Sequence, residues 1–358
     1  MHLGTTALLE FYNRHRDDES LVLVTITGIV GSTYRKPGAM MLIAPDHEYE
    51  GMISGGCLEG DLLHHADEVF ASGEPKSVTY DMHAGEDLVW GLGIGCDGVI
   101  HLLLQRLDPP GDCAMLDWIR SSLEAGDSVL IGLVCRPGET GFSLGDIGLI
   151  DAAGRQFGHE SLAELCRSHA AETWPGWRYR EAEHDGAGAM LINVPPQPRV
   201  LLCGAGPDAV PVARQFDALG WHCTVVDHRP AYARPDRFPA GCEVVQTRPP
   251  QLQEHVELEG LDAAVIMSHN LDNDADYLRQ LAPVSASGGL AYLGVLGPTT
   301  RRDRLRDMAE CQELPVRGPV GLDIGAELPE GIALSIAAEI HAVLNLRDGL
   351  ALTGKGRK

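Results

Sequence analysis

The chain has 358 residues, a formal net charge of -23, 44% hydrophobic residues and 42 glycines. This length exceeds one ordinary hydrophobic core, so we expect a soluble α/β protein of two or three domains. An acidic surface repels phosphate backbones and anionic lipids, which argues against nucleic-acid and membrane binding.

The cysteines and the N-terminus point to the cytoplasm. Nine cysteines are spread along the chain without C-x-x-C pairs, and no secretory signal pattern opens it. No apolar run approaches the about 20 residues that cross a bilayer. We therefore expect a cytoplasmic protein without a disulfide framework.

The first part of the chain mixes helical and strand patterns. Apolar residues recur at helical spacing at 5–15 and again at 58–69, after Cys57, and both segments are predicted to be helices. Apolar and β-branched runs predict strands at 21–30, 39–44, 49–53, 77–81 and 98–104. Glycine-rich segments at 31–38 and 91–98 interrupt them. The pattern is typical of a small α+β domain.

Cys57 follows Ser54, Gly55 and Gly56 and comes directly before a predicted helix. A thiol at a helix N-terminus meets the positive end of the helix dipole, which favours the reactive thiolate. The two glycines would let the backbone approach whatever the sulfur touches. The alternative is an inert, buried cysteine in a tight turn.

The middle of the chain is less informative. A helix is predicted at 115–124 and strands at 128–136 and 146–151, after which the sequence becomes polar and poorly patterned. The run Pro195-Pro196-Gln197-Pro198 is the clearest boundary in the chain.

A Rossmann signature follows that boundary. A short apolar strand at 199–203 runs into the sequence Gly204-Ala205-Gly206-Pro207-Asp208-Ala209, which has the form G-x-G-x-x-A. A predicted helix at 209–219 and a strand at 222–226, ending at Asp227, complete a βαβ unit. This context predicts a doubly wound parallel sheet.

Four residues of this region are candidate ligand-binding residues. Gly204 and Gly206 would let a pyrophosphate rest on the helix N-terminus, and Asp227 would hold a ribose with a free 2′-hydroxyl. His269, after the predicted strand at 263–267, is a candidate ligand or proton carrier. The alternatives are a Rossmann-shaped domain that binds no dinucleotide and a histidine that only forms a local hydrogen bond.

The fold expected is α/β, with a C-terminal Rossmann-type parallel sheet domain and a smaller N-terminal α/β (α+β) domain. The segments expected are an N-terminal domain at 1–108, a middle connecting region at 109–195, a Rossmann-like domain at 196–350 and a tail at 351–358.

Taken together, the motifs at both ends of the chain resemble those of the XdhC/CoxI family. In the N-terminal half the matching residues are Gly31-Ser32-Thr33, Arg35, Pro37-Gly38, Met41, Ser54 to Cys57 and Gly93 to Cys96. In the C-terminal half they are Gly204 to Gly206, Asp227 to Pro230, Ser268-His269, Asp274, Tyr292 to Gly294, Gly321 to Glu327 and Ile332 to Ile340.

The resemblance implies a maturation factor for molybdenum hydroxylases rather than an enzyme. Such a protein would store the molybdopterin cofactor, assist its sulfuration and insert it into xanthine dehydrogenase or aldehyde oxidase-type enzymes. The implied partner is an apo molybdenum hydroxylase, with a cysteine desulfurase as a further candidate. A homodimer is the expected assembly.

The cofactor's chemistry assigns roles to the candidate residues. It is a polyanion ending in a phosphate or a dinucleotide pyrophosphate, and its molybdenum takes soft sulfur ligands. We expect Cys57 and Cys96 to contact molybdenum or carry sulfur. The N–H groups of Ser54, Gly55, Gly56 and Cys57, with Arg35 or Lys36, would neutralise phosphate, and Gly204 to Gly206 would hold the nucleotide end.

Two other functions remain open from the sequence. One is an NAD-dependent oxidoreductase, with Asp227 on the ribose and His269 or Cys57 as acid or base. The other is a scaffold that binds only proteins and leaves its Rossmann domain empty.

Overall fold

The computed structural model describes residues 4–16, 20–82, 98–138, 141–170 and 178–353. The chain divides into two compact units, Met1–Pro196 and Gln197–Lys358, and each is described by itself. Both the 1–108 and the 109–195 segments lie in the first unit. Among the helices of the described ranges, none has the length and apolar character to span a bilayer.

The first unit contains two antiparallel sheets. Sheet A has the strand order β3-β2-β1-β5-β4. Its strands are β1 (Leu21–Gly31), β2 (Met40–Ile43), β3 (Tyr49–Gly51), β4 (Lys76–Asp81) and β5 (Gly98–Leu107). β1 is buried over its first six residues, with apolar side chains on both faces, as expected for the central strand of the sheet.

Sheet B has the strand order β8-β7-β6-β10-β9. Its strands are β6 (Val129–Arg136), β7 (Ile147–Asp151), β8 (Gln156–Gly158), β9 (Tyr179–His184) and β10 (Ala187–Val194). The helices of the first unit are α1 (Thr5–His15), α2 (Glu59–Ser72), α3 (Ala114–Glu124) and α4 (Glu160–Ala170).

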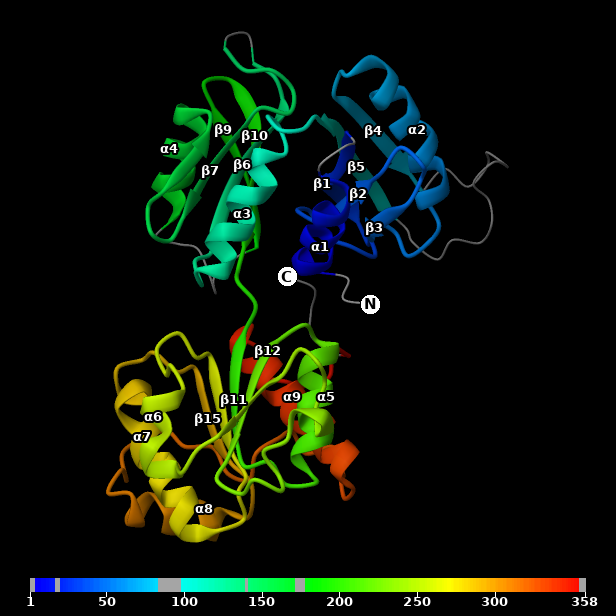
Figure 1. The fold of residues 1–358 in the computed structure, drawn as a ribbon. Helices are drawn as coiled ribbons and strands as arrows, with labels where there is room; N and C mark the ends of the chain where they lie inside the picture. Colours follow the sequence, from blue (N-terminus) through cyan, green and yellow to red (C-terminus); the bar gives the residue numbers. More distant parts are fainter. Residues whose placement is uncertain (1–3, 17–19, 83–97, 139–140, 171–177, 354–358) are drawn as a thin grey trace. The chain divides into compact units, whose positions relative to one another are not determined.

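The two sheets are packed between helices (Figure 1). α2 covers one face of sheet A, and α4 covers one face of sheet B. The remaining core draws Leu23 and Leu42 from sheet A, Ile131 and Met190 from sheet B, and further residues from α1 and α3. The two sheets therefore share one hydrophobic core.

One glycine sets how closely α4 packs on sheet B. A Cβ built on Gly148 of β7 would lie 2.5 Å from the backbone nitrogen of Ala163 and from the Cβ of Leu162, both in α4. No real side chain fits in that space, so this contact requires glycine.

The second unit is a doubly wound parallel sheet, sheet C, with the order β13-β12-β11-β14-β15. Its strands are β11 (Arg199–Cys203), β12 (His222–Asp227), β13 (Glu243–Gln246), β14 (Ala263–Ile266) and β15 (Tyr292–Val295). α5 (Ala209–Ala218) and α9 (Pro329–Leu344) cover one face. α6 (Leu252–His255), α7 (Leu271–Ala286) and α8 (Thr299–Met308) cover the other (Figure 1). The fold class expected from the sequence is confirmed.

The strand order reverses at β11, so the loops after β11 and β14 leave the sheet in neighbouring positions. In open parallel sheets this reversal is the usual place for a ligand.

Several elements escaped the sequence reasoning. The segment we found poorly patterned holds α4, β9 and β10. β9 alternates between exposed and half-buried residues, so it lacks the apolar run that marks a strand. α8 was missed because, of its ten residues, Leu305 alone is buried.

Candidate functional site

The loop between β3 and α2 presents Cys57. Gly55 and Gly56 have φ angles of +90° and +107°, in the left-handed region that favours glycine. Gly55, Gly56 and Cys57 form an exposed run, so Cys57 is not the buried cysteine of the alternative interpretation. α2 begins at Glu59, two residues after Cys57.

The carboxylate of Glu59 fills the inside of this loop. Its Oε1 accepts the backbone N–H groups of Ile53, Ser54 and Gly55 at 3.1, 2.8 and 3.3 Å. Its Oε2 accepts the N–H groups of Gly56 and Leu58 at 2.9 and 3.2 Å and the Ser54 hydroxyl at 2.5 Å. Burial alone would raise the pKa of Glu59, but the hydrogen bonds from Ser54 and the loop backbone outweigh it and lower that pKa. Glu59 is therefore ionised at neutral pH.

This arrangement revises the role expected of Ser54, Gly55 and Gly56. Their N–H groups donate to a carboxylate of the same chain, so they are not free to cradle a phosphate or to stabilise a thiolate at Cys57. Sequence reasoning did not single out Glu59. The available signal was an acid in the first turn of a helix that follows a glycine-rich loop, where backbone N–H groups have no partner within the helix.

A second loop lies beside the first. The ring of Tyr34 is 3.7 Å from the position that a Cβ on Gly55 would take, and Tyr34 is 62% exposed. Arg35 is half-buried and Lys36 is exposed. The hydrogen bonds and ion pairs found among the described residues leave the side chains of Arg35 and Lys36 unused. The structure thus brings the 31–38 segment and Cys57 together.

Cys96 lies outside the described residues, so the expected pairing of Cys57 with Cys96 is not addressed. Within the described ranges, no three His, Cys, Asp or Glu side chains converge in a way that could hold a metal ion.

At the carboxyl edge of sheet C, Gly204 allows two loops to meet. Its φ is +122°, and a Cβ there would lie 2.6 Å from the carbonyl oxygen of Met267 and 2.8 Å from the Cα of Ser268. A Cβ on Gly206 would lie 2.6 Å from a carboxylate oxygen of Asp208. Gly204 is thus required by the packing of the chain, whether or not a ligand binds.

Asp227 is held inside the protein. It is 1% exposed, and its oxygens accept the N–H of Ala205 at 2.8 Å and the N–H of Arg229 at 2.9 Å. The Arg229 guanidinium donates two further hydrogen bonds, at 2.9 and 2.7 Å. Burial would raise the pKa of Asp227, but the bonds from Arg229 and Ala205 outweigh it and hold that pKa below its usual value.

The carboxylate that we assigned to a ribose therefore ties the glycine loop to Arg229 instead. The guanidinium of Arg229 in turn lies over the ring of Tyr232, 4.0 Å from its centroid. The physical reason is local, because Arg229 follows Asp227 by two residues and reaches back over it.

His269 also has a partner within the chain. Its Nε2 lies 2.8 Å from an oxygen of Asp208, beside Gly206, and its own φ is +62°. The His269 side chain is 59% exposed, so it faces solvent at the edge where a pyrophosphate would be expected. An acid at this position opposes an anion unless His269 is charged.

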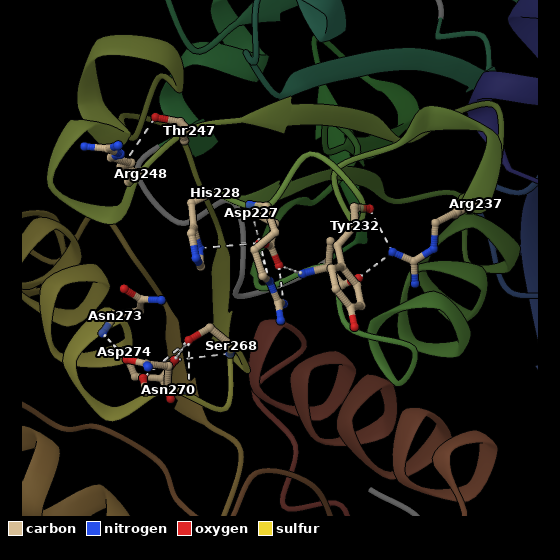
Figure 2. Close-up of polar contacts among 12 residues, drawn as sticks. Asp227, His228, Tyr232, Arg237, Thr247, Arg248, Ser268, Asn270, Asn273 and Asp274 are labelled. Atoms are coloured by element: carbon tan, nitrogen blue, oxygen red, sulfur yellow. Dashed lines mark hydrogen bonds and ion pairs between the residues drawn. The ribbon is translucent and has the colours of Figure 1, made fainter.

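The rest of the edge is polar. Asp274 is buried, accepts the N–H and hydroxyl of Ser268, and pairs with Arg301 at 2.6 Å. His228 and Arg248 lie at the ends of β12 and β13 (Figure 2), the first with a side chain 37% exposed and the second exposed. The Nδ1 of His228 lies 3.5 Å from an oxygen of Asp227, and Arg248 and His269 are more exposed basic side chains of this edge.

Two cavities, of about 680 and 540 Å³, lie between sheets A and B in the first unit. The larger is lined by apolar residues of the shared core together with polar side chains such as Gln105 and Asp146, and the smaller by strand residues that include His101 and Cys135. Neither is lined by the Cys57 loop, so they do not extend the candidate site.

Comparison with known proteins identifies the family. Residues 15–81 match the XdhC and CoxI family, and residues 200–340 match the XdhC Rossmann domain. The chain is 32% identical over 341 residues to a Bacillus subtilis protein named as a probable subunit of xanthine dehydrogenase, covering 95% of this chain and 96% of that protein. The chain belongs to the XdhC and CoxI family.

Two further relatives extend the comparison. The XdhC-family chain is 24% identical over 333 residues to the Escherichia coli molybdenum cofactor insertion chaperone PaoD, covering 90% of this chain and 83% of PaoD. A Bacillus halodurans crystal structure described as a xanthine dehydrogenase matches 96% of this chain and 97% of that one, at 30% identity and a TM-score of 0.78.

Several motif residues that carried the XdhC resemblance have structural partners. Glu339 of α9 accepts the Tyr292 hydroxyl at 2.6 Å and the Gly321 N–H at 2.7 Å, and it pairs with Arg317 at 3.1 Å. This network fastens the segment after residue 320 to β15 and α9. It accounts for these residue types without a ligand.

Proposed function

We propose that this protein carries the molybdenum cofactor as cargo, assists its sulfuration and inserts it into an apo molybdenum hydroxylase. The observation that carries the proposal is the relationship to PaoD, a molybdenum cofactor insertion chaperone, over 90% of this chain. A relationship of that extent spans both units rather than the Rossmann domain alone. We place this activity in the cytoplasm, as the sequence suggests.

In the first unit, we propose that the cargo meets the surface formed by Cys57, Tyr34 and Arg35. Cys57 is exposed and supplies the kind of soft sulfur ligand that molybdenum accepts. Tyr34 offers an exposed ring on which a planar pterin can stack, and it lies beside Gly55, where no side chain intervenes. Arg35 and Lys36 supply positive charge for the phosphate, and we keep Cys96 as a second sulfur ligand.

In the second unit, we propose that any nucleotide end of the cofactor meets His228 and Arg248. Asp227 is committed to Ala205 and Arg229, and Asp208 adds negative charge beside Gly206. The same two features weigh against the NAD-dependent oxidoreductase, which needs the Asp227 carboxylate for a ribose. A cysteine desulfurase as sulfur donor and a homodimer remain parts of the proposal.

The test is to purify the protein from molybdenum-replete cells, denature it and measure oxidised pterin fluorescence together with molybdenum. We expect near-stoichiometric pterin in the native protein and a large loss in a Cys57→Ala variant. A Cys311→Ala variant, altered in the other unit, is the matched control and should retain the pterin. No pterin in the native protein, or hydride transfer with NAD, would overturn the proposal.

A further inference from the structure

We propose that Glu59 is the positioning residue of Cys57: a buried carboxylate of the chain itself fixes the loop that presents the thiol. The link to cofactor transfer rests on the function proposed above. The positioning of Cys57 does not, and it can be measured without any cofactor.

The hydrogen bonds to Glu59 enclose Cys57 on both sides. Before it, Gly56 donates to the carboxylate; after it, Leu58 does the same and also donates to the Ser54 hydroxyl oxygen at 2.8 Å. One side chain therefore sets the direction of the backbone on either side of the thiol. Cys57, which lies between these two donors, is exposed.

Few other contacts restrain the backbone of the loop at Gly55 and Gly56. Gly55 and Gly56 both have positive φ angles, and glycine restricts the backbone least of all residues. A Cβ on Gly56 would meet no atom within 4 Å, so packing does not confine that residue. Ile53 and Leu58 anchor the two ends of the loop in the core, and between them the loop is held by its hydrogen bonds to Glu59, which is 4% exposed.

The charge of Glu59 matters as well as its shape. Hydrogen bonds to an ionised acceptor are about twice as strong as neutral ones. A glutamine would offer one acceptor oxygen and an NH₂ group, and the latter would face backbone donors. Removing the carboxylate also frees N–H groups beside the thiol and removes a negative charge, and both effects favour a thiolate.

Two other acids of α2, Asp61 in its first turn and Glu68 further along the helix, do not contact the loop backbone. Asp61 accepts the Tyr80 hydroxyl at 2.6 Å and lies 3.4 Å from His65, away from the loop backbone. Glu68 is exposed and pairs with Lys76, which follows the same helix. Glu68→Gln is therefore a matched control that changes the same charge on the same element.

The experiment measures the rate at which iodoacetamide alkylates Cys57 in the full-length protein, by peptide mass spectrometry. Glu59→Gln and Glu59→Ala should react at least about fivefold faster than the native protein, because the freed donors favour the thiolate. Glu68→Gln should react at the native rate. Thermal melting of each variant shows whether it is folded.

Chemical rescue separates positioning from general loosening. Acetate can enter the space vacated in Glu59→Ala and accept the same N–H groups, so it should return the rate toward the native value. Neutral acetamide should not. A native alkylation rate in Glu59→Gln, or equal effects of acetate and acetamide on Glu59→Ala, would overturn the proposal.

The outcomes for the two proposals are distinguishable. If Cys57→Ala still activates an apo hydroxylase fully, the role of Cys57 in transfer fails, while the alkylation and acetate results still report on Glu59. If transfer does depend on Cys57, Glu59→Gln should lower activation at least about tenfold, in line with the cost of misplaced reacting groups.

Discussion

Replacing Asp227 with asparagine should destabilise the second unit by about 1–3 kcal/mol, the usual cost of leaving buried donors without their acceptor, because Asp227 is buried while its partner Arg229 is 36% exposed. The change keeps the size of the side chain and removes its charge. Asp227 is 1% exposed and accepts four hydrogen bonds, three of them from Arg229. The four cannot be summed, because they share one carboxylate and respond together.

Urea unfolding followed by circular dichroism measures this change. The curve should be fitted with two transitions, because the chain has two compact units. Hydrogen exchange in peptides that cover β11 and β12 identifies the transition belonging to the second unit. Asp236→Asn, at an exposed acid paired with Arg234, is the control and should leave the curve unchanged.

The effect of Asp227 also depends on pH. Its pKa is lower in the folded protein than the value of about 3.9 for a free aspartate. Its stabilising contribution is therefore complete above about pH 4 and is lost as the pH falls through the folded value. The difference between the native protein and Asp227→Asn should shrink on acidification. A neutral-pH effect below about 1 kcal/mol, or a difference that persists unchanged in acid, would refute the reasoning.

Three other outcomes are expected. Iodoacetamide at mildly alkaline pH should modify Cys57 much faster than Cys166, whose pKa is raised to about 12 by burial; comparable rates in peptide mass spectrometry would contradict this. Gly148→Ala should lower the free energy of unfolding by about 1–3 kcal/mol, measured in urea, because α4 must move to make room for the new Cβ. Gly111→Ala, which has open space around it, should leave that free energy unchanged. Glu339→Gln should lower stability by about 2 kcal/mol through its three charge-assisted contacts, and an unchanged unfolding midpoint would show that the network is not stabilising.

The Rossmann half was the more predictable part of the fold. Its signature is local: a buried strand, the glycines at 204 and 206, a helix and a second strand occur in one short stretch. Sheet B was harder, because β9 has an alternating polar pattern and β10 pairs on its other side with β6, which lies far away in the sequence. Local sequence carries little information about such pairings.

For the candidate site, the sequence identified the right loops but not the partners of their polar groups. It located Cys57 and the carboxyl edge of sheet C. It could not show that Glu59 and Arg229 occupy the donors and acceptors that a ligand was expected to use. A side chain two or three residues away reaches such groups only in a particular backbone conformation, which residue types alone do not specify.

The core shared by sheets A and B has a practical consequence for dissecting this protein. A fragment ending at Asp108 would keep Leu23 and Leu42 but lose Ile131 and Met190, which cover them. The fragment would then expose a large hydrophobic patch to water, and such patches cause self-association. Studies of the Cys57 loop apart from the second unit should therefore use residues 1–196 as the smallest fragment. Without sheet B, the segment that carries Cys57 is expected to aggregate.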